Sequence, residues 1–476
     1  MPNLEHIFHP RSIAVVGASP NPLNAVTRLF LDPLLHFGFE GELYPIHPTA
    51  SEVSGLKTYP SILDVPGPVD HVICGIRADL TPNLMKECTA KKVNSIQLFT
   101  ASFSESGEMK GIRLEKEIAE IARQGNVRVL GPNCMGIYCP GSRMSYEPFF
   151  PRESGNIGCF CQSGGNSIEI IQFGSVRNAH FSKVVSYGNA CDIDEVELLE
   201  YFTDDPQTEI ITGYIEGTKN GRRLAQALHK ATEVKPVIML KGGVTKAGTK
   251  AAASHTGSLA GNAVIWDSVL HQSGVTQVYD MEELIDLALL FQHLKPVSGK
   301  QVALVGGGGG SSVLITDICE QEGLLVPSFP DELKRKLREI IPVEADPGTS
   351  VRNPVDTSSS GPYPGIISAT LETIDNYAGV DFTLFFSGLY PGAEDMVANQ
   401  INSIIAIKER LNKPIIVVIR YDQVPESGNI ALALQQTCTQ AGIPVFRSFD
   451  RAARTISRFV RYYEDRDNGK KPTKHG

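Results

Sequence analysis

The sequence predicts an α/β protein built from parallel, doubly wound sheets. Short apolar runs alternate with helical patterns along almost the whole chain, and a glycine-rich turn follows the first apolar run of each predicted domain. The 476 residues are too many for one hydrophobic core. We therefore expect domains over residues 1–140, 150–295 and 298–465, followed by a polar tail over 466–476.

The composition is that of a soluble globular protein, with 42% hydrophobic and 20% charged residues, and the scattered cysteines favour the cytoplasm. A formal net charge of −9 disfavours nucleic acids and anionic membranes as partners, because phosphate groups bind basic surfaces. No apolar run is long enough to span a bilayer, and the first residues lack the apolar region of a signal peptide. The nine cysteines are scattered, which favours reduced thiols; Cys159 and Cys161 are expected on one face of a buried strand, not at a metal.

The first domain is expected to begin with a strand, a glycine turn and a helix. Residues 13–16 are apolar, Gly17 allows a tight turn, and the following residues have helical periodicity despite Pro33. Helical patterns over 81–92 and 111–125 separate later apolar runs. Those runs predict further strands within 41–48, 70–76, 94–100 and 127–133.

The second and third domains share one plan, which indicates an internal repeat. Each opens with a strand, a glycine turn and a helix, within 155–174 and 299–323. Each later places a Lys-Pro pair directly before an apolar strand, within 235–243 and 413–421. Other apolar runs predict strands at the start of 183–202 and within 209–217, 380–388 and 442–447.

The turn formed by Gly17, Ala18 and Ser19 is a candidate anion site. It follows a predicted strand and is expected to open a helix, whose first N–H groups attract phosphate. Ligands of doubly wound sheets bind at the carboxyl ends of the strands. The sequence is not the GxGxxG of nicotinamide-binding folds, which counts against an NAD-dependent oxidoreductase. A plain strand-to-helix turn is an equal alternative.

Ser163, Gly164 and Gly165 form a second turn of this kind, with backbone N–H groups and one hydroxyl available to an anion. The residues around Ser163 do not form the G-x-S-x-G elbow, which counts against a serine hydrolase. The five glycines at 306–310 lack the Lys-Ser/Thr of a P-loop, so ATP binding there is not supported. A flexible turn explains them at least as well.

His255 is the one imidazole in "AAASHTGSLAG", residues 251–261, where every neighbour is small. We expect it on a loop at the carboxyl end of a sheet. No second His, Cys or carboxylate lies within a helical turn, which disfavours metal binding. A nucleophilic histidine needs an anion cradle and an acid that orients its ring, and Glu216 at the end of an apolar strand is the candidate acid. A turn-capping histidine and an exposed glutamate are the alternatives.

Eight stretches, taken in order, resemble the nucleoside-diphosphate-forming acyl-CoA synthetases, relatives of succinyl-CoA synthetase. The resemblance extends to about residue 460, and its most specific part is the Ser-His-Thr-Gly-Ser-Leu-Ala-Gly run at 254–261. The stretches are "IAVVGAS", "GPNCMGI", "CQSGG", "VVSYGNACDIDEVELLEYFTDDPQT", "YIEG", "AAASHTGSLAG", "NPVD" and "AGIPVF".

The resemblance implies a Rossmann-like CoA-binding domain followed by two flavodoxin-like ligase domains. It implies that His255 is phosphorylated during turnover, that Glu216 steadies the phosphohistidine, and that Ser163, Gly164 and Gly165 hold its phosphate. On the CoA side, the residues that match are Gly17, Ala18, Ser19, Pro48, Ile76 and Asn133.

The activity implied by the resemblance interconverts acyl-CoA, ADP and phosphate with a carboxylic acid, CoA and ATP through an acyl phosphate. The family's ATP-grasp module does not follow the third domain. The resemblance therefore implies an alpha subunit in a hetero-oligomer, with ATP/ADP and Mg²⁺ on a separate ATP-grasp beta subunit. The residues at 47–49, 74–78 and 306–312 depart from the usual pattern. A CoA-responsive regulatory subunit without turnover is the alternative.

Overall fold

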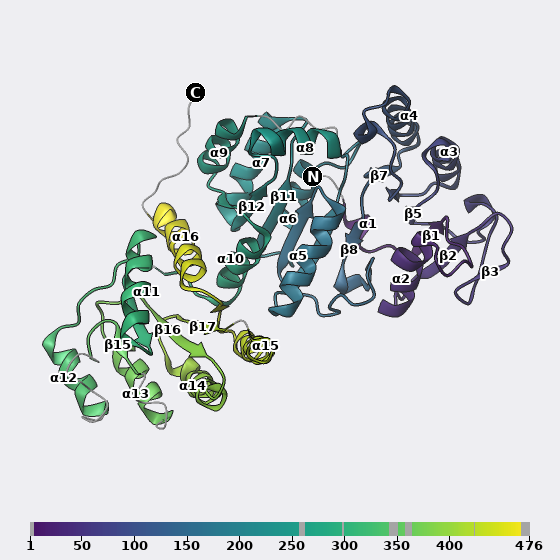
Figure 1. The fold of residues 1–476 in the computed structure, drawn as a ribbon. Helices are drawn as coiled ribbons and strands as arrows, with labels where there is room; N and C mark the ends of the chain where they lie inside the picture. Colours follow the sequence, from purple (N-terminus) through teal and green to yellow (C-terminus); the bar gives the residue numbers. More distant parts are fainter. Residues whose placement is uncertain are drawn as a thin grey trace. The chain divides into compact units, whose positions relative to one another are not determined.

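Three predominantly parallel sheets, each flanked by helices, form the framework of the protein (Figure 1). A computed structural model describes residues 4–256, 262–297, 299–341, 351–357, 364–422 and 424–467, except for the side chains of 253–256 and 364. The described chain divides into two compact units. Unit 1 comprises Met1–Ser175 with Ala179–Leu284, and unit 2 comprises Val176–Asn178 with Ile285–Gly476.

The first sheet, in unit 1, has the strand order β2-β1-β5-β6-β7 with every pair parallel. Its central strands β1, β5 and β6 are buried along their whole length, as expected for a parallel sheet with helices on both faces. All five strands were predicted. They are β1 (Ser12–Val16), β2 (Glu42–Ile46), β5 (His71–Cys74), β6 (Ser95–Leu98) and β7 (Arg128–Leu130). The helices include α1 (Glu5–Phe8), α2 (Asp32–Phe37), α3 (Thr81–Lys91) and α4 (Met109–Gly125).

The second sheet, also in unit 1, has the order β13-β12-β11-β9-β10-β8. The short edge strand β8 is antiparallel to β10 and was not predicted. Cys159 and Cys161 lie fully buried two residues apart on β9, as expected for one face of a strand. The strands are β8 (Gly136–Tyr138), β9 (Ile157–Cys161), β10 (Phe181–Ser186), β11 (Ile210–Ile215), β12 (Val237–Lys241) and β13 (Thr276–Val278). The helices are α5 (Gly164–Val176), α6 (Glu195–Asp204), α7 (Gly221–Val234), α8 (Lys246–Thr256) and α9 (Ala263–Gln272). Helix α10 (Met281–His293) begins in unit 1, and its residues from Ile285 onward belong to unit 2.

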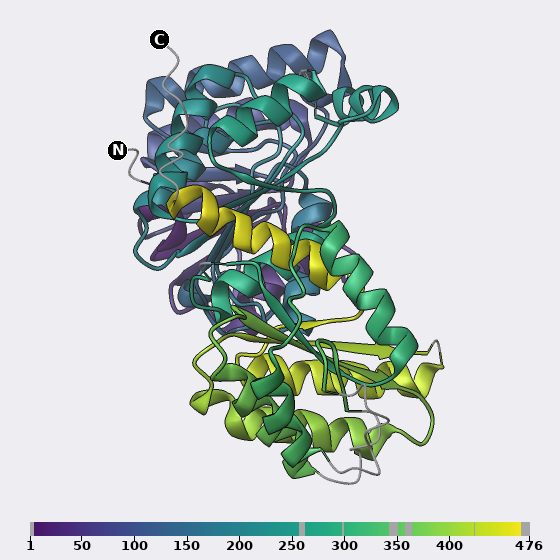
Figure 2. The ribbon, with the colours of Figure 1, turned by 90° about the vertical axis from the view of Figure 1, so that its left-hand side faces the viewer.

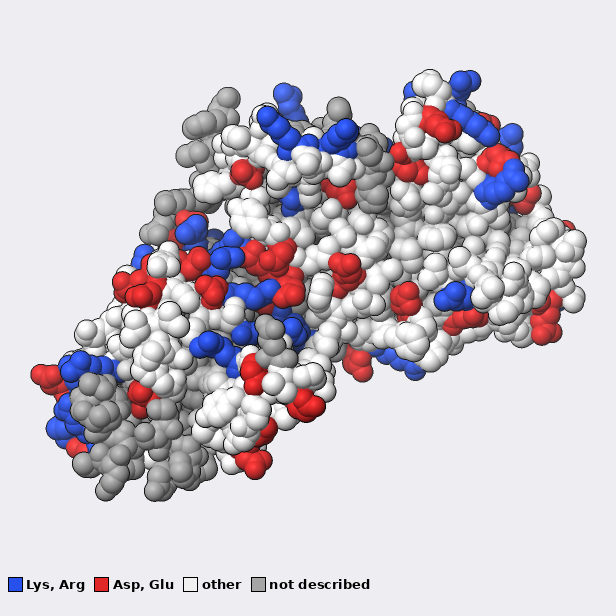
Figure 3. Space-filling model, viewed as in Figure 1, with Lys and Arg blue, Asp and Glu red and all other residues white. Residues whose placement is uncertain are grey.

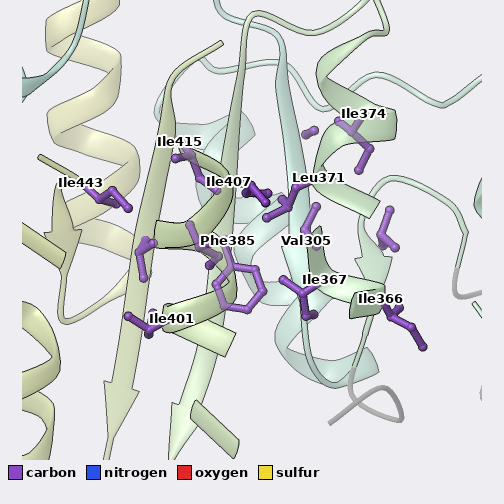
Figure 4. Packing of buried hydrophobic residues seen from close by; sticks show 14 of the residues in the cluster. Val305, Ile366, Ile367, Leu371, Ile374, Phe385, Ile401, Ile407, Ile415 and Ile443 are labelled. Atoms are coloured by element: carbon purple, nitrogen blue, oxygen red, sulfur yellow. The ribbon is translucent and has the colours of Figure 1, made fainter. Parts of the chain in front are cut away.

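The third sheet, in unit 2, has the order β15-β14-β16-β17-β18. Helices α11 and α16 lie side by side in both ribbon views (Figures 1 and 2), and α13 and α14 pack together. Figure 4 shows Phe385 of β16 between Ile367 of α13 and Ile401 of α14, within one apolar core. The strands are β14 (Val302–Gly306), β15 (Val355–Asp356), β16 (Phe382–Leu389), β17 (Ile415–Tyr421) and β18 (Val445–Phe446). The helices are α11 (Gly309–Gln321), α12 (Asp331–Ile340), α13 (Pro364–Asp375), α14 (Glu394–Ile407), α15 (Pro425–Gln440) and α16 (Phe449–Asp467).

The two Lys-Pro pairs occupy equivalent places in the second and third sheets, which supports the predicted repeat. Each pair precedes the fourth parallel strand of its sheet, β12 or β17. Lys235 Nζ donates to the carbonyls of Phe202 and Asp205, both at 2.7 Å, and Lys413 Nζ donates to the carbonyl of Tyr377. These carbonyls lie at or just beyond the C-terminal end of the helix that leads to the third parallel strand, which is α6 in the second sheet and α13 in the third. Burial lowers the pKa of both lysines.

The surface carries charges of both signs. Figure 3 shows basic and acidic side chains interspersed over α4, where Arg123 pairs with Glu120 at 2.7 Å. No helix in the described ranges is long and apolar enough to cross a membrane. The predicted polar tail begins too early, because α16 continues to Asp467; residues 468–476 lie outside the described chain.

Removal of the Asp286 carboxylate is expected to destabilise unit 2. Asp286 is 2% exposed and pairs with both Arg177 and Arg451, whose Nε lies 2.8 Å from Asp286 Oδ2. Asp286→Ala leaves both guanidinium groups without this carboxylate, which we expect to cost about 3 kcal/mol of unfolding free energy in urea. Asp331→Ala, which removes a fully exposed carboxylate paired with Lys334, is the control and should leave the urea midpoint unchanged. Equal effects of the two substitutions would contradict the prediction.

Candidate functional site

The strand order predicts a crevice at the carboxyl end of each of the first two sheets. In both, the first strand lies between the second and the third, so the connections on either side of it leave toward opposite faces. Ligands of doubly wound sheets bind at the carboxyl ends of the strands where this reversal occurs. The reversal lies between β1 and β5 in the first sheet and between β9 and β11 in the second.

The first crevice brings together residues that the sequence predicted on the CoA side. Gly17, after β1, has φ +99°, and a Cβ there would lie 3.1 Å from Ile76 Cγ2, after β5. Glycine is therefore required for both the conformation and the close approach. Ala18 is buried beside this turn. Thr100 connects Ile76 to Asn133, because its hydroxyl donates to the Ile76 carbonyl at 2.7 Å and its own carbonyl accepts from Asn133 N at 3.1 Å.

The expectation that the Gly17 turn opens a helix directly is wrong. Helical residues begin at 25, with a π-helix η1 (Thr27–Leu31) that continues into α2. Asn24 Oδ1 accepts from Thr27 N at 2.8 Å and so caps this helix, while Ser19 N donates to Thr27 Oγ1 at 2.8 Å. The intervening loop contains Pro20 and Pro22, which have no N–H to donate. Pro33 lies in the first turn of α2, where a proline is tolerated.

His47, directly after β2, stabilises a turn at the edge of the first sheet. Its Nδ1 accepts from Thr49 N at 3.2 Å and from Ala50 N at 2.9 Å. An asparagine side-chain oxygen stabilises turns by the same local bond to the backbone. The imidazole therefore holds the turn in which Pro48 is exposed.

The second crevice holds Glu216, which is only 4% exposed at the end of β11. Its main-chain N donates to Gln162 Oε1 at 2.7 Å, and Gly217 N donates to the same oxygen at 3.2 Å. The Tyr214 hydroxyl donates to Glu216 Oε1 at 3.0 Å. Burial, followed by the Glu216 charge, raises the pKa of Tyr214, so this hydroxyl keeps its proton. Glu216 is thus a buried carboxylate held in one place by residues of β9 and β11.

The predicted phosphate turn borders the same crevice. Ser163 is 8% exposed and directly precedes α5, which begins at Gly164. Asn166 N donates to Ser163 Oγ at 3.4 Å. The other N–H groups in the first turn of α5 are of the kind that helices use to bind anions. A Cβ on Gly164 would lie 2.9 Å from Met135 Cγ, two residues beyond Asn133. The segment after β7 therefore connects the first crevice to the phosphate turn.

The loop expected around His255 is wrong for its main chain, because the last turn of α8 includes this residue. The preceding alanines at 251–253 explain the helix through their high helix propensity. The His255 side chain and residues 257–261 lie outside the described chain. Helix α8 packs against the short helix η4 (Ser104–Ser106), which follows β6 of the first sheet.

Sequence reasoning missed Gln162, Tyr214 and Lys241 as parts of this site. Burial lowers the pKa of Lys241 to about 8, opposed by the charge of Glu216. The available signal was a polar residue at the very end of an apolar strand, as in "VIMLK". Over the described ranges, no group of three or more His, Cys, Asp and Glu side chains is placed to hold a metal ion.

Two family models match the chain. The model described as CoA binding domain matches residues 11–140, and the model described as Succinyl-CoA ligase like flavodoxin domain matches residues 154–291. Together they cover more than half of the chain and both crevices. The fold and its two sites therefore define a CoA-binding, succinyl-CoA-ligase-like protein.

Known proteins similar to this chain narrow the class. The alpha subunit of acetate–CoA ligase [ADP-forming] II from Pyrococcus furiosus is 36% identical over 357 residues, which cover 75% of this chain and 76% of the relative. The acetate–CoA ligase [ADP-forming] of Methanocaldococcus jannaschii is 37% identical over 358 residues, 74% of this chain but only 49% of the relative. This chain therefore spans about half the length of that relative.

A solved structure agrees over the whole chain. The dinucleotide forming acetyl-coenzyme A synthetase 1 of Ca. Korarchaeum cryptofilum, in complex with phosphate and ADP, gives a TM-score of 0.85 at 30% identity. The match covers 98% of this chain and 99% of that chain. The chain belongs to the ADP-forming acyl-CoA synthetase family, as the resemblance implied.

Two substitutions of His47 test whether the turn needs an imidazole or only a hydrogen-bond acceptor. His47→Ala removes an acceptor of two backbone N–H groups and should cost about 1 kcal/mol of unfolding free energy in unit 1. His47→Asn supplies a comparable acceptor and should stay close to the wild type in urea unfolding. If both substitutions were equally destabilising, the turn would depend on the ring itself.

Proposed function

We propose that the chain is the alpha subunit of an ADP-forming acyl-CoA synthetase. The observation that carries this proposal is the buried Glu216 carboxylate beside the N-terminus of α5, in the crevice of the second sheet. Burying a carboxylate is costly unless it is paired or hydrogen-bonded, and the Tyr214 hydroxyl donates to Glu216. A structural strand end would not need this arrangement.

The proposed reaction begins with acyl-CoA and inorganic phosphate, which exchange the thioester for an acyl phosphate and release CoA. His255 then attacks phosphorus, so that the carboxylic acid leaves and a phosphohistidine forms. The phosphoryl group finally passes to ADP, which gives ATP and regenerates the imidazole. Covalent transfer divides one difficult exchange into easier steps. In the reverse direction, ATP drives thioester formation.

The residues of the second crevice suit the phosphohistidine step. The N–H groups at Gly164 and Gly165 and the N-terminal end of α5 favour a negatively charged phosphoryl group. Ser163 adds a hydroxyl beside them. Glu216 is proposed to accept a hydrogen bond from the His255 ring and so to hold it with its other nitrogen toward phosphorus. Helix α8, which contains His255 in its last turn, lies in the same unit.

CoA is proposed to bind in the first crevice, where the backbone at Gly17 is accessible without a side chain. The segment from Asn133 to Met135 links this crevice to the phosphate turn, which suits a thioester that must reach phosphate.

Acetate is the proposed acid, because the two sequence relatives described above are named acetate–CoA ligases. We place the protein in the cytoplasm, since its nine cysteines are all free thiols.

The proposed partner is a separate ATP-grasp beta subunit that binds ATP or ADP with Mg²⁺, in a hetero-oligomer. Two facts support it: one relative is named an alpha subunit, and another is about twice as long as the matched region. On this proposal, the longer relative carries both functions in one chain.

Phosphorylation of His255 is the first expected outcome. The purified chain, incubated with acetyl-CoA and ³²P-orthophosphate, should acquire label that is labile in acid and stable in base. His255→Ala should abolish the label. Glu216→Gln should slow labelling by about 100-fold, because it removes one preorganised charge from the site.

The same experiment separates the proposal from its main alternative. A chain that binds CoA in calorimetry but never acquires label would be a CoA-responsive regulatory subunit instead. His255→Ala must then be shown to fold and bind CoA like the wild type, so that loss of label reports on the imidazole alone.

Turnover of ATP is expected to require the partner. The chain alone, with ATP, CoA and acetate, should form no acetyl-CoA, and the ATP-grasp subunit of an alpha/beta relative should restore formation if the two assemble. Rapid acetyl-CoA synthesis by the chain alone would overturn the proposed division of labour between two subunits.

A further inference from the structure

Lys241 is a buried cation at the end of β12, directly beside the second crevice. The residue is 5% exposed. Its Nζ donates to the main-chain carbonyl of Glu216 at 2.8 Å and to that of Gly242. The Lys241 ammonium group therefore links Glu216, which directly follows β11, to Gly242, which directly follows β12.

The same ammonium contacts the far end of the chain segment that contains His255. It lies 5.0 Å from the ring centroid of Trp266, a cation–π contact, and Trp266 is 7% exposed on α9. Residues 243–262, between Gly242 and α9, include His255. Lys241 thus contacts one residue before this segment and one residue after it.

Tyr214 also connects Glu216 to Gly242, independently of Lys241. Its hydroxyl donates to Glu216 Oε1 at 3.0 Å, and a Cβ on Gly242 would lie only 2.5 Å from that hydroxyl oxygen. No side chain fits at Gly242 unless Tyr214 moves. The Glu216 carboxylate and the start of the segment are therefore held close together from two sides.

The internal repeat shows that the fold itself does not need a lysine here. Val237 on β12 pairs with Ile211, and Ile415 on β17 pairs with Thr383, so these positions are equivalent. Four residues later, the second sheet has Lys241 and the third has Ile419, which is fully buried.

Glu216 is missing from the third sheet in the same way. It lies five residues after Ile211, and the position five residues after Thr383 is Gly388. The glutamate and the lysine are thus present together in one repeat and absent together from the other. An apolar residue would avoid the cost of burying an ammonium group, which indicates that Lys241 serves the site.

We propose that Lys241 is a positioning residue for phosphoryl transfer: it fixes the main chain of Glu216 relative to both ends of the segment that carries His255. This inference rests on the proposed function. A small misplacement of a group that orients a nucleophile lowers its rate steeply, by about 100-fold for an error near 1 Å.

The first test measures the contact between Lys241 and Trp266 and does not depend on enzymatic activity. Trp266 is the only tryptophan of the chain, so its fluorescence reports on Lys241 directly. Because the pKa of Lys241 is lowered to about 8, wild-type emission should change with a midpoint near pH 8, with Glu216 as the charged group facing the ammonium. The transition should vanish in Lys241→Met. A wild type without the transition, or a Met variant that keeps it, would overturn the contact.

The second test measures phosphohistidine formation from acetyl-CoA and ³²P-orthophosphate. Lys241→Met should lower the labelling rate by about 100-fold with the KM for acetyl-CoA little changed, and Lys241→Arg should recover to within about 10-fold. Lys235→Met is the matched control. Lys235 lies at the other end of β12 and likewise donates to two carbonyls, at 2.7 Å each, but far along the strand from Glu216. It should label within about 3-fold of the wild type at equal folded fraction.

The outcomes separate the two proposals. Label in the wild type together with equal rates for Lys241→Met and Lys235→Met would overturn the positioning role and leave the proposed function standing. A wild type that acquires no label would overturn the proposed function, and the positioning role with it. Slow labelling of Lys241→Met, with recovery in Lys241→Arg and a near wild-type rate in Lys235→Met, supports both.

Discussion

The structure around the second crevice depends on keeping one carboxylate buried. Glu216 is 4% exposed, and such a group is tolerated only where fixed donors replace water. Tyr214 supplies a donor to the carboxylate, Gln162 accepts from the main-chain N–H, and Lys241 donates to the main-chain carbonyl. These residues come from three neighbouring strands, so the carboxylate has a defined position only when β9, β11 and β12 are paired.

The repeated strand order explains why two different ligands can be handled in one unit. Each reversal point opens a crevice at the carboxyl ends of its strands, one beside Gly17 and one beside Ser163. The segment after β7 supplies Asn133 to the first crevice and Met135 to the second. On the proposed function, CoA binds in the first crevice and its thioester reaches phosphate at the second.

Local pattern was enough to predict the strands of the first sheet, the strand–turn–helix openings of the second and third sheets and the Lys-Pro repeat. It was not enough for β8, β13 and β15, because strands of two or three residues carry no periodic signal of their own. β7 and β18 are equally short, but both lie in apolar runs that predicted a strand. The helix start after Gly17 was displaced by two prolines and the Asn24 cap. Glu216 could be proposed because it ends an apolar strand, but Tyr214 and Lys241 became visible only once pairing brought their strands together.

The comparison between the repeats separates what the fold needs from what the site needs. Lys235 and Lys413 perform the same packing task in both sheets, each donating to a carbonyl at or just beyond the end of the helix that leads to the third parallel strand. Their recurrence makes them part of the fold. Lys241, one strand length away, has an isoleucine as its counterpart, and the difference coincides with the presence of Glu216. A buried lysine that one copy of a fold replaces by an apolar residue is therefore best explained by the chemistry of the copy that keeps it.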